Sequence, residues 1–287
     1  MPSPQPGHRA ARTTAATLLL LSAVAYTAWV LEVVLSTGLD PVQAYISELA
    51  AEDQPLGGLF RATDLAAGLC LLAAAGTALA TGQAGASRRH RWALAGWSAL
   101  ALFGAATAAD SRLPLSCAPT SDEMCAARET AGLVPATHTA HAVTSSLAMA
   151  GALTALVSLT VAARRYRWWP PVRRFGPWLL GAELLATGWS LASIAAFQAG
   201  RGTWALGAGQ RLQVLLVAIW LGLLALGIAR SARTDAPDAP DPSDAPDTPD
   251  TPDAPDTPHV SDPSDRTHED AMPRHRPAGP SRGRRPT

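Results

Sequence analysis

The sequence predicts an all-α integral membrane protein, a compact six-helix transmembrane bundle followed by a disordered C-terminal tail. Apolar residues form 48% of the 287 residues, yet the mean hydropathy is only +0.09. The average is low because apolar residues gather in six blocks, whereas polar residues collect elsewhere. Each block approaches or exceeds the roughly 20 residues that cross about 30 Å of hydrocarbon as a helix.

The six blocks are rich in alanine and glycine, and small residues let membrane helices pack closely. The first block follows Arg9 and Arg12, an arrangement that also occurs in cleaved secretory signal peptides. Its apolar run continues to Leu35, which is longer than a signal sequence and favours an uncleaved first helix. The predicted helices are residues 13–35, 59–81, 92–109, 138–162, 177–197 and 207–229.

The arginine distribution predicts the orientation of these helices. No lysine is present, which together with abundant alanine, proline and glycine is typical of a GC-rich bacterial genome. Arginines concentrate on one side of the predicted membrane, and the opposite side has fewer than half as many, so the arginine-rich side is expected to be cytoplasmic. That side holds Arg9, Arg12, Arg88, Arg89, Arg91, Arg164, Arg165, Arg167, Arg173, Arg174, Arg230 and Arg233.

The predicted organisation is therefore that of a multi-pass protein of the bacterial cell membrane with both termini in the cytoplasm. Residues 1–12 form the cytoplasmic N-terminus, residues 13–230 the six-helix transmembrane domain and residues 231–287 the tail. Membrane lipid is the expected partner. The formal net charge is zero, so no nucleic-acid partner is expected.

The tail has a composition unlike that of the helices. Aspartate recurs at every third residue from Asp235 to Asp256, which would align the carboxylates along one edge of a polyproline II segment. With so few large apolar side chains the tail cannot fold alone. From Arg274 to Arg285 it becomes basic. It is either a solvated disordered segment or an arm that contacts a protein or anionic lipid headgroups.

Polar residues from separate segments converge on the predicted outer side. Ionisable groups at membrane depth are costly and usually face the bundle interior, where partners or water satisfy them. We therefore expect an extracytoplasmic polar pocket that binds a lipid headgroup, an ion or a small ligand. The residues of this outer polar cluster are Ser47, Glu48, Arg61, Asp64, Asp110, Arg112, His138, His141, Gln210 and Arg211.

Three chemistries fit this cluster. His138 and His141 share a helix face, and with Asp64 or Asp110 they would supply three ligands for zinc and leave one position for water. A metal-free hydrolase would use a histidine base, an orienting carboxylate and Ser47 as nucleophile, with Glu48 as a further candidate acid or base. A purely structural network would instead pair Arg61 with Asp64 and Asp110 with Arg112. The HxxH spacing lacks the glutamate base of zincins.

Two acidic residues lie within the predicted helices. Glu32 is in the outer part of the first helix and Glu183 toward the cytoplasmic part of the fifth. If both face inward, they could extend from the outer cluster as a path for a proton- or ion-coupled carrier. No matching pair of broken half-helices is present, so a transporter with inverted repeats is poorly supported.

The connection between the third and fourth helices contains two cysteines. Cys117 and Cys125 are eight residues apart in LSCAPTSDEMC, and the orientation places them outside the cytoplasm, where a disulfide persists. A bond between them would rigidify the segment before His138. Cys70, inside the second helix, is interpreted as a small buried apolar residue.

Five stretches, taken in order and spacing, resemble the domain of unknown function 998 family of bacterial and archaeal multi-span membrane proteins. The resemblance covers about residues 13–230, implies a six-helix bundle and supplies no reaction. The stretches are YISELAA (45–51), LFRATDLAAG (59–68), ATAADSRLPLSCAP (106–119), HTAHAVTS (138–145) and GQRL (209–212). The motif positions fall on Ser47, Glu48, Arg61, Asp64, Asp110, Cys117, Cys125, His138 and His141.

Two more remote similarities bear on activity. The Ser-Glu loop before the second helix is similar to the stress-related six-span Frag1/DRAM group. The content of serine, aspartate and histidine is similar to the multi-span ceramidase and progestin-receptor-type hydrolases, which act on lipids. Those hydrolases carry a histidine motif in a late helix, whereas this chain has no histidine between His141 and His259. Three functions therefore remain as alternatives: a membrane protein that binds a ligand in its outer pocket, a membrane-embedded hydrolase of a lipid-like substrate, and a proton- or ion-coupled carrier.

Overall fold

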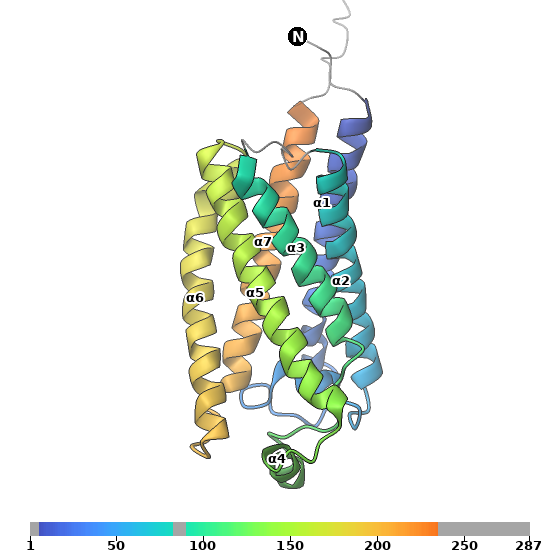
Figure 1. The fold of residues 1–287 in the computed structure, drawn as a ribbon, viewed down its shortest axis with the longest axis vertical. Coiled ribbons are helices and arrows are strands. Elements are labelled where there is room, and N and C mark those ends of the chain that lie inside the picture. The colour runs from blue at the N-terminus through green and yellow to red at the C-terminus, as the bar shows by residue number, and fades with distance from the viewer. Residues whose placement is uncertain (1–5, 83–89, 235–287) are drawn as a thin grey trace, which may run out of the picture. The chain divides into compact units, whose positions relative to one another are not determined.

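The computed structural model describes residues 6–82 and 90–234, which form helices and their connections without any strand. The chain order is visible in Figure 1. The helices are α1 (Pro6–Tyr26), the 3-10 helices η1 (Ala28–Val33) and η2 (Ile46–Ala50), α2 (Gly57–Ala80), α3 (Arg91–Asp110), α4 (Glu123–Thr130), α5 (Ala136–Arg165), α6 (Pro170–Gln198) and α7 (Leu206–Thr234).

Six segments are long and apolar enough to cross a membrane, so the predicted all-α six-helix transmembrane bundle is confirmed for the described residues. These segments are Gly7–Val33, Gly57–Ala80, Arg91–Asp110, Ala136–Arg165, Pro170–Gln198 and Leu206–Arg233. The acidic and basic tail, from residue 235 onward, lies outside the described residues.

The six long helices form a closed ring in which each helix packs against two neighbours. The order around the ring is α1, α2, α3, α5, α6, α7 and back to α1. Small residues permit the closest approaches. A Cβ on Gly68 would lie 2.7 Å from the Gly104 oxygen, and one on Gly104 would lie 2.8 Å from the Gly68 oxygen, so both positions require glycine for α2 and α3 to touch. The contact between α5 and α6 is the least extensive of the ring.

The two ends of the bundle are built differently. Toward the end where α1 begins and α7 finishes, the interior is an apolar core that includes Trp97, Leu156, Leu159 and Trp220. At the opposite end lie α4, η2 and the connections that follow α1 and α6 (Figure 1). This second end, called the α4 end below, holds the polar residues that the sequence analysis singled out.

The helices differ from the predicted ones in three respects: the ends of α1, α6 and α7, the conformation of the first span after Tyr26, and the additional helix α4. α1 begins at Pro6 and α7 continues to Thr234, because an apolar run marks the membrane-crossing part of a helix and not its solvated ends. The first span also changes from α-helix to the 3-10 helix η1 after Tyr26, which turns Glu32 into the protein interior.

Helix α4 is the third difference, since the sequence analysis treated residues 110–138 as a connection. The Asp122 carboxylate caps this helix by accepting a hydrogen bond from the Met124 N–H at 2.8 Å. Glu123 in the first turn and Arg128 in the last complement the helix dipole. The helix has too few apolar residues to be found by hydropathy.

Candidate ligand-binding site

A buried ion pair joins the first and last membrane helices near the α4 end. Arg211 Nε donates to Glu32 Oε1 at 2.6 Å, and its Nη2 donates to Oε2 at 2.7 Å. Arg211 Nη1 also donates to the carbonyl oxygens of Ala44 at 3.0 Å and Gly207 at 3.2 Å. Both side chains are buried. A bidentate pair in which the guanidinium uses four of its five N–H donors is a structural clamp between α7, η1 and the connection before η2.

The predicted path from Glu183 through Glu32 is therefore not formed. Both Glu32 oxygens accept from Arg211, and Glu32 does not line the pocket described below. The sequence could not reveal this because the partners are 179 residues apart.

Glu48 forms the second clamp. This fully buried carboxylate accepts the Thr120 N–H at 2.8 Å and the Thr120 hydroxyl, and so ties η2 to the connection before α4. Burial raises the pKa of the Glu48 carboxyl to about 7, although the two Thr120 hydrogen bonds act in the opposite direction. Its neighbour Ser47 lines the pocket, whereas Glu48 does not.

Arg61 closes the same region by binding backbone. Its Nη1 donates to the carbonyl oxygens of Ala50 at 2.7 Å and Ala51 at 3.2 Å, which end η2. The interaction is with η2 and not with Asp64, the partner expected from the spacing of three residues. Two unsatisfied carbonyl groups at the end of a short helix are strong acceptors for a guanidinium.

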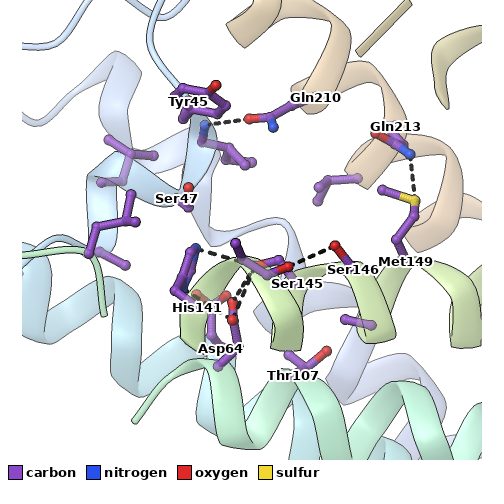
Figure 2. Close-up of a pocket in the computed structure, with 18 of the residues that line it drawn as sticks. Tyr45, Ser47, Asp64, Thr107, His141, Ser145, Ser146, Met149, Gln210 and Gln213 are labelled. Atoms are coloured by element: carbon purple, nitrogen blue, oxygen red, sulfur yellow. Dashed lines mark hydrogen bonds and ion pairs between the residues drawn. The ribbon is translucent and has the colours of Figure 1, made fainter. Parts of the chain in front are cut away.

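A pocket of about 460 Å³ lies inside the α4 end of the bundle (Figure 2). Its wall contains residues of α1, η2, α2, α3, α5, α6 and α7, most of them apolar or aromatic. Seven predicted site residues line it: Ser47, Asp64, Asp110, His138, His141, Glu183 and Gln210. The others lie outside the lining: Glu32, Glu48, Arg61, Arg112, Cys117, Cys125 and Arg211.

Asp110, the last residue of α3, is the centre of the polar side of this pocket. Its carboxylate accepts hydrogen bonds from the Thr144 hydroxyl and from the Ser145 hydroxyl, which lies 3.1 Å from each carboxylate oxygen. His141 Nδ1 lies 3.1 Å from Asp110 Oδ1. We call Asp110, His141, Thr144 and Ser145 the Asp110 cluster. It joins the end of α3 to the start of α5.

The cluster replaces the predicted Asp110–Arg112 pair. Arg112 is exposed and does not line the pocket. α5 presents one imidazole and two hydroxyl groups to the carboxylate over a single turn, and these donors satisfy it. Asp64, on α2, lies beside His141 (Figure 2) and is close enough to interact with the charges of Asp110 and His141.

The two histidines fix the connection after α3 with opposite tautomers. The Ser116 N–H donates to His138 Nδ1 at 3.2 Å, so the proton of the neutral ring is on Nε2. His141 Nδ1 lies 3.1 Å from the Leu113 carbonyl oxygen, which can only accept, so its proton is on Nδ1. His141 Nε2 is then an acceptor, 3.2 Å from Ser145 Oγ.

This arrangement does not assemble the predicted zinc ligands. Both Nδ1 atoms are used by the chain, and His138 Nε2 lies 4.0 Å from Glu129 Oε1. Within residues 6–82 and 90–234, no three His, Cys, Asp or Glu side chains are placed to hold a metal ion together.

Four buried polar groups that line the pocket form no hydrogen bond of normal geometry within the described part of the chain. They are the carboxylate of Glu183 on α6, Trp29 Nε1 on η1, Thr107 Oγ1 on α3 and His138 Nε2 on α5. Buried polar groups are nearly always satisfied in native proteins, so a group of exceptions around one cavity indicates a missing partner. The pocket itself is the space in which such a partner would lie.

Exposed lining residues lie on α5 and α6, in addition to the exposed Glu129 on α4. On the two membrane helices they are Ala142 and Ser146 of α5, and Leu191 and Gln198 of α6. These two helices also make the least extensive contact of the ring. Since both are membrane-spanning helices, the surface around them is the one that faces lipid.

The connection that covers the pocket is held by a disulfide between Cys117 and Cys125, whose Cα atoms are 6.0 Å apart. Cys125 is fully buried at the start of α4, and Arg128 Nη2 donates to Cys117 Sγ at 3.6 Å. The disulfide, the Glu48 clamp and the two histidines thus all hold residues 113–120 in place.

Sequence reasoning missed several residues of the site. Thr144 and Ser145 are three and four residues after His141, so helical spacing places them on its face, yet a serine and a threonine on a membrane helix are too common to be distinctive. Thr120, Thr107 and Gln213 gave no signal at all. Gln213 donates to Met149 Sδ at 2.6 Å and to Thr187 Oγ1 at 2.9 Å, on the same side of the pocket as Glu183.

Comparison with known proteins gives one match. No curated protein and no solved structure matches the chain. The family model described as "Protein of unknown function (DUF998)" matches residues 15–227, which include four of the six membrane helices in full and most of the first and the last. A match over most of the chain means that this membrane protein belongs to the DUF998 family.

Proposed function

We propose that this protein binds an amphiphilic molecule from the membrane in the pocket at the α4 end. The observation that carries the proposal is the pocket itself: one side is the polar Asp110 cluster, most of the remaining lining is apolar or aromatic, and exposed lining residues lie on α5 and α6, which face lipid. A volume of about 460 Å³ is within the range of small-molecule sites. A ligand with one polar and one apolar end matches such a lining.

Lateral entry distinguishes this proposal from a water-borne ligand. A lipid-like molecule moves in the bilayer and reaches the pocket between α5 and α6 without crossing the connections at the α4 end. Those connections are fixed by the disulfide, by Glu48 and by Arg211. The rigid cover and the weak α5–α6 contact thus both favour access from the side.

We further propose that the α4 end faces away from the cytoplasm. The arginines of the connections concentrate at the opposite end, as cytoplasmic arginines do. The Cys117–Cys125 disulfide supports the same orientation because disulfides persist in oxidising compartments. The ligand would then come from the outer leaflet.

Photolabelling tests the binding proposal. The full chain in nanodiscs of a zwitterionic lipid is irradiated with a decanol that carries a diazirine, and the labelled peptides are identified by mass spectrometry. We expect label on α5 and α6 beside the pocket. Ala142→Phe should remove this label by filling the proposed entry, whereas Ala150→Phe, an exposed position of α5 outside the lining, should retain it. Equal labelling of both variants would overturn the proposal.

A second candidate function is hydrolysis of an ester of such a molecule, and the Asp110 cluster favours it. Ser145 Oγ is 3.2 Å from His141 Nε2, and the Leu113 carbonyl holds the ring in the tautomer that leaves Nε2 free to accept a proton. Oγ would attack the ester carbonyl as its proton moves to Nε2. That proton would leave with the alcohol, and water would then hydrolyse the acyl-serine.

Hydrolysis ranks second because of the position of the Ser145 hydroxyl. Its single proton is directed at the Asp110 carboxylate, 3.1 Å away, and catalysis requires it to turn to His141. A fluorophosphonate probe, which reacts with activated serines, separates the candidates. Labelling that disappears in Ser145→Ala and persists in the neighbouring Ser146→Ala would establish the hydrolase, and no labelling would exclude Ser145 as an activated nucleophile.

A further inference from the structure

Glu183 is a buried carboxylate that has no cationic partner in the described structure. It lies on α6 with 0% of its surface exposed and lines the pocket near the Gln213 amide, and neither of its oxygens accepts a hydrogen bond of normal distance and angle within residues 6–82 and 90–234. An isolated buried carboxylate is costly, and proteins that keep one usually pair it with a cation or another ligand. Glu183 therefore lines the pocket without a cation to balance its charge, and the pocket offers space for one.

Glu32 shows how this protein treats a buried carboxylate that has only a structural role. Each Glu32 oxygen accepts a short hydrogen bond from Arg211, which the chain provides from α7. No arginine lines the pocket around Glu183. The chain thus pairs the buried Glu32 carboxylate with a cation and places no arginine beside Glu183 in the pocket lining.

The charge of the pocket lining points to the sign of the ligand. Four lining residues are acidic, namely Asp64, Asp110, Glu129 and Glu183, and its only basic residues are His138 and His141. Both histidines use Nδ1 to hold residues 113–116, and neither needs a proton beyond the neutral ring to do so. The lining is therefore acidic when the carboxyl groups are ionised, and it favours a cation.

Aromatic side chains lie in the same lining. Tyr26, Trp29, Tyr45, Phe60 and Phe103 all contribute to it, and Tyr26 lies close enough to Asp64, Asp110 and Glu183 to experience the charge of each. Aromatic faces attract organic ammonium groups through cation–π interactions. A small metal ion would instead need three or more well-placed ligands, and the described residues hold no such group.

We propose that the ligand is an amphiphilic organic cation, an alkylammonium, whose charged group pairs with Glu183. This inference rests on the proposed binding function and adds the chemical class of the ligand. The alkyl chain lies against the apolar wall and extends toward α5 and α6, where Leu191 is exposed. The ammonium group then gives the Glu183 carboxylate the cationic partner that the described part of the chain does not provide.

The test compares three probes that share one alkyl chain: octyltrimethylammonium, 1-octanol and octanoate, all below micellar concentration. Binding to the full chain in nanodiscs of a zwitterionic lipid is measured by calorimetry, and empty nanodiscs correct for partition into lipid. We expect the cation to bind about tenfold or more tightly than the alcohol, and octanoate to bind most weakly. Glu183→Gln should reduce cation affinity about tenfold and leave octanol binding unchanged.

Each outcome of this test decides one question. Octanol binding to Glu183→Gln also shows that the variant is folded, and Glu123→Gln, an exposed acid of α4 outside the lining, is the matched control that should bind like the wild type. Equal affinity for the cation and the alcohol, or a cation affinity unaffected by Glu183→Gln, would overturn the alkylammonium inference and leave the amphiphile pocket intact. If none of the three probes binds, the proposed function fails as well.

Discussion

The buried polar residues of the α4 end fall into two groups that differ in one respect, whether the chain provides their partners. At the clamps, Glu32 is paired with Arg211 and Glu48 with Thr120, and all four carboxylate oxygens accept hydrogen bonds. Around the pocket, Glu183, Thr107 Oγ1 and His138 Nε2 form no hydrogen bond of normal geometry in the described structure, and Glu183 has no cationic partner there. Both groups are buried within one bundle.

The difference shows that polarity inside a membrane protein is no guide to function until the partners are known. A charge satisfied by the chain stabilises the fold, and a charge left unsatisfied beside a cavity is available to a ligand. The two groups should therefore respond to substitution in opposite ways. Clamp substitutions should lower the free energy of unfolding, and pocket substitutions should change binding.

Removing one member of the ion pair should have the largest effect on stability. Arg211→Met leaves the Glu32 carboxylate buried without a partner, and we expect a loss of about 3–5 kcal/mol in the free energy of unfolding. The double variant Glu32→Gln/Arg211→Met removes both charges and should recover part of that loss. Unfolding in mixed micelles by a denaturing detergent measures both. A loss below about 1 kcal/mol for Arg211→Met would contradict the assignment of this pair as a clamp.

Glu48 should make stability depend on pH. Its folded-state pKa is raised from the ordinary value of 4.5 to about 7, so the folded state binds the proton more tightly than the unfolded state does. The stabilisation is complete below pH 4.5 and is lost as the pH rises through about 7, by at most about 3 kcal/mol.

Unfolding of the wild type and of Glu48→Gln at pH 5 and pH 8 tests this dependence. The variant should lose most of the difference between the two pH values, and the exposed Glu52→Gln should retain it. If Glu48→Gln keeps the full wild-type pH dependence, another group is responsible.

The disulfide should contribute somewhat less. A bond that closes a loop between residues eight apart is worth about 2–3 kcal/mol in the chain-entropy model. Cys117→Ser/Cys125→Ser should lower the free energy of unfolding by that amount, and a reductant should lower the wild type alone. Equal sensitivity of wild type and variant to reductant would show that the bond is not the cause.

Ser145 should give the smallest effect, because it lines the pocket and is also bonded within the Asp110 cluster. Ser145→Ala removes one hydrogen bond to a carboxylate that keeps Thr144 and His141, so we expect a loss of about 1 kcal/mol. Ser47→Ala, which lines the pocket without a corresponding bond to a charge, is the comparison and should change stability by less than about 0.5 kcal/mol. A loss above about 3 kcal/mol for Ser145→Ala would make the cluster a clamp.

Much of the fold could be predicted from the sequence, because apolar blocks of membrane-crossing length fix the number and kind of helices. Helix α4 was missed because its ends are set by an Asp122 cap and not by hydropathy. The convergence of polar residues at one end was also predicted. Successive helices cross the membrane in opposite directions, so every second connection lies on the same side.

The division of these residues into clamps and pocket lining could not be predicted. Neighbours in sequence separate, as Ser47 faces the pocket and Glu48 faces Thr120. Distant residues combine, as Glu32 does with Arg211. Spacing of three residues suggested Arg61–Asp64, but unsatisfied carbonyl oxygens at the end of η2 bind the guanidinium instead. Which residues form a pair depends on how segments distant in sequence pack together. The spacing of residues within one segment carries no information about that packing.

One measurement tests the contrast most directly: the free energy of unfolding and the octyltrimethylammonium affinity, determined side by side for Glu32→Gln and Glu183→Gln. Both substitutions neutralise one buried carboxylate of nearly the same shape. We predict that Glu32→Gln is destabilised by about 3 kcal/mol and binds the cation like the wild type, whereas Glu183→Gln is at least as stable as the wild type and binds about tenfold more weakly. If Glu183→Gln is destabilised as much as Glu32→Gln and keeps its affinity, Glu183 is structural and the division between clamp and pocket is wrong.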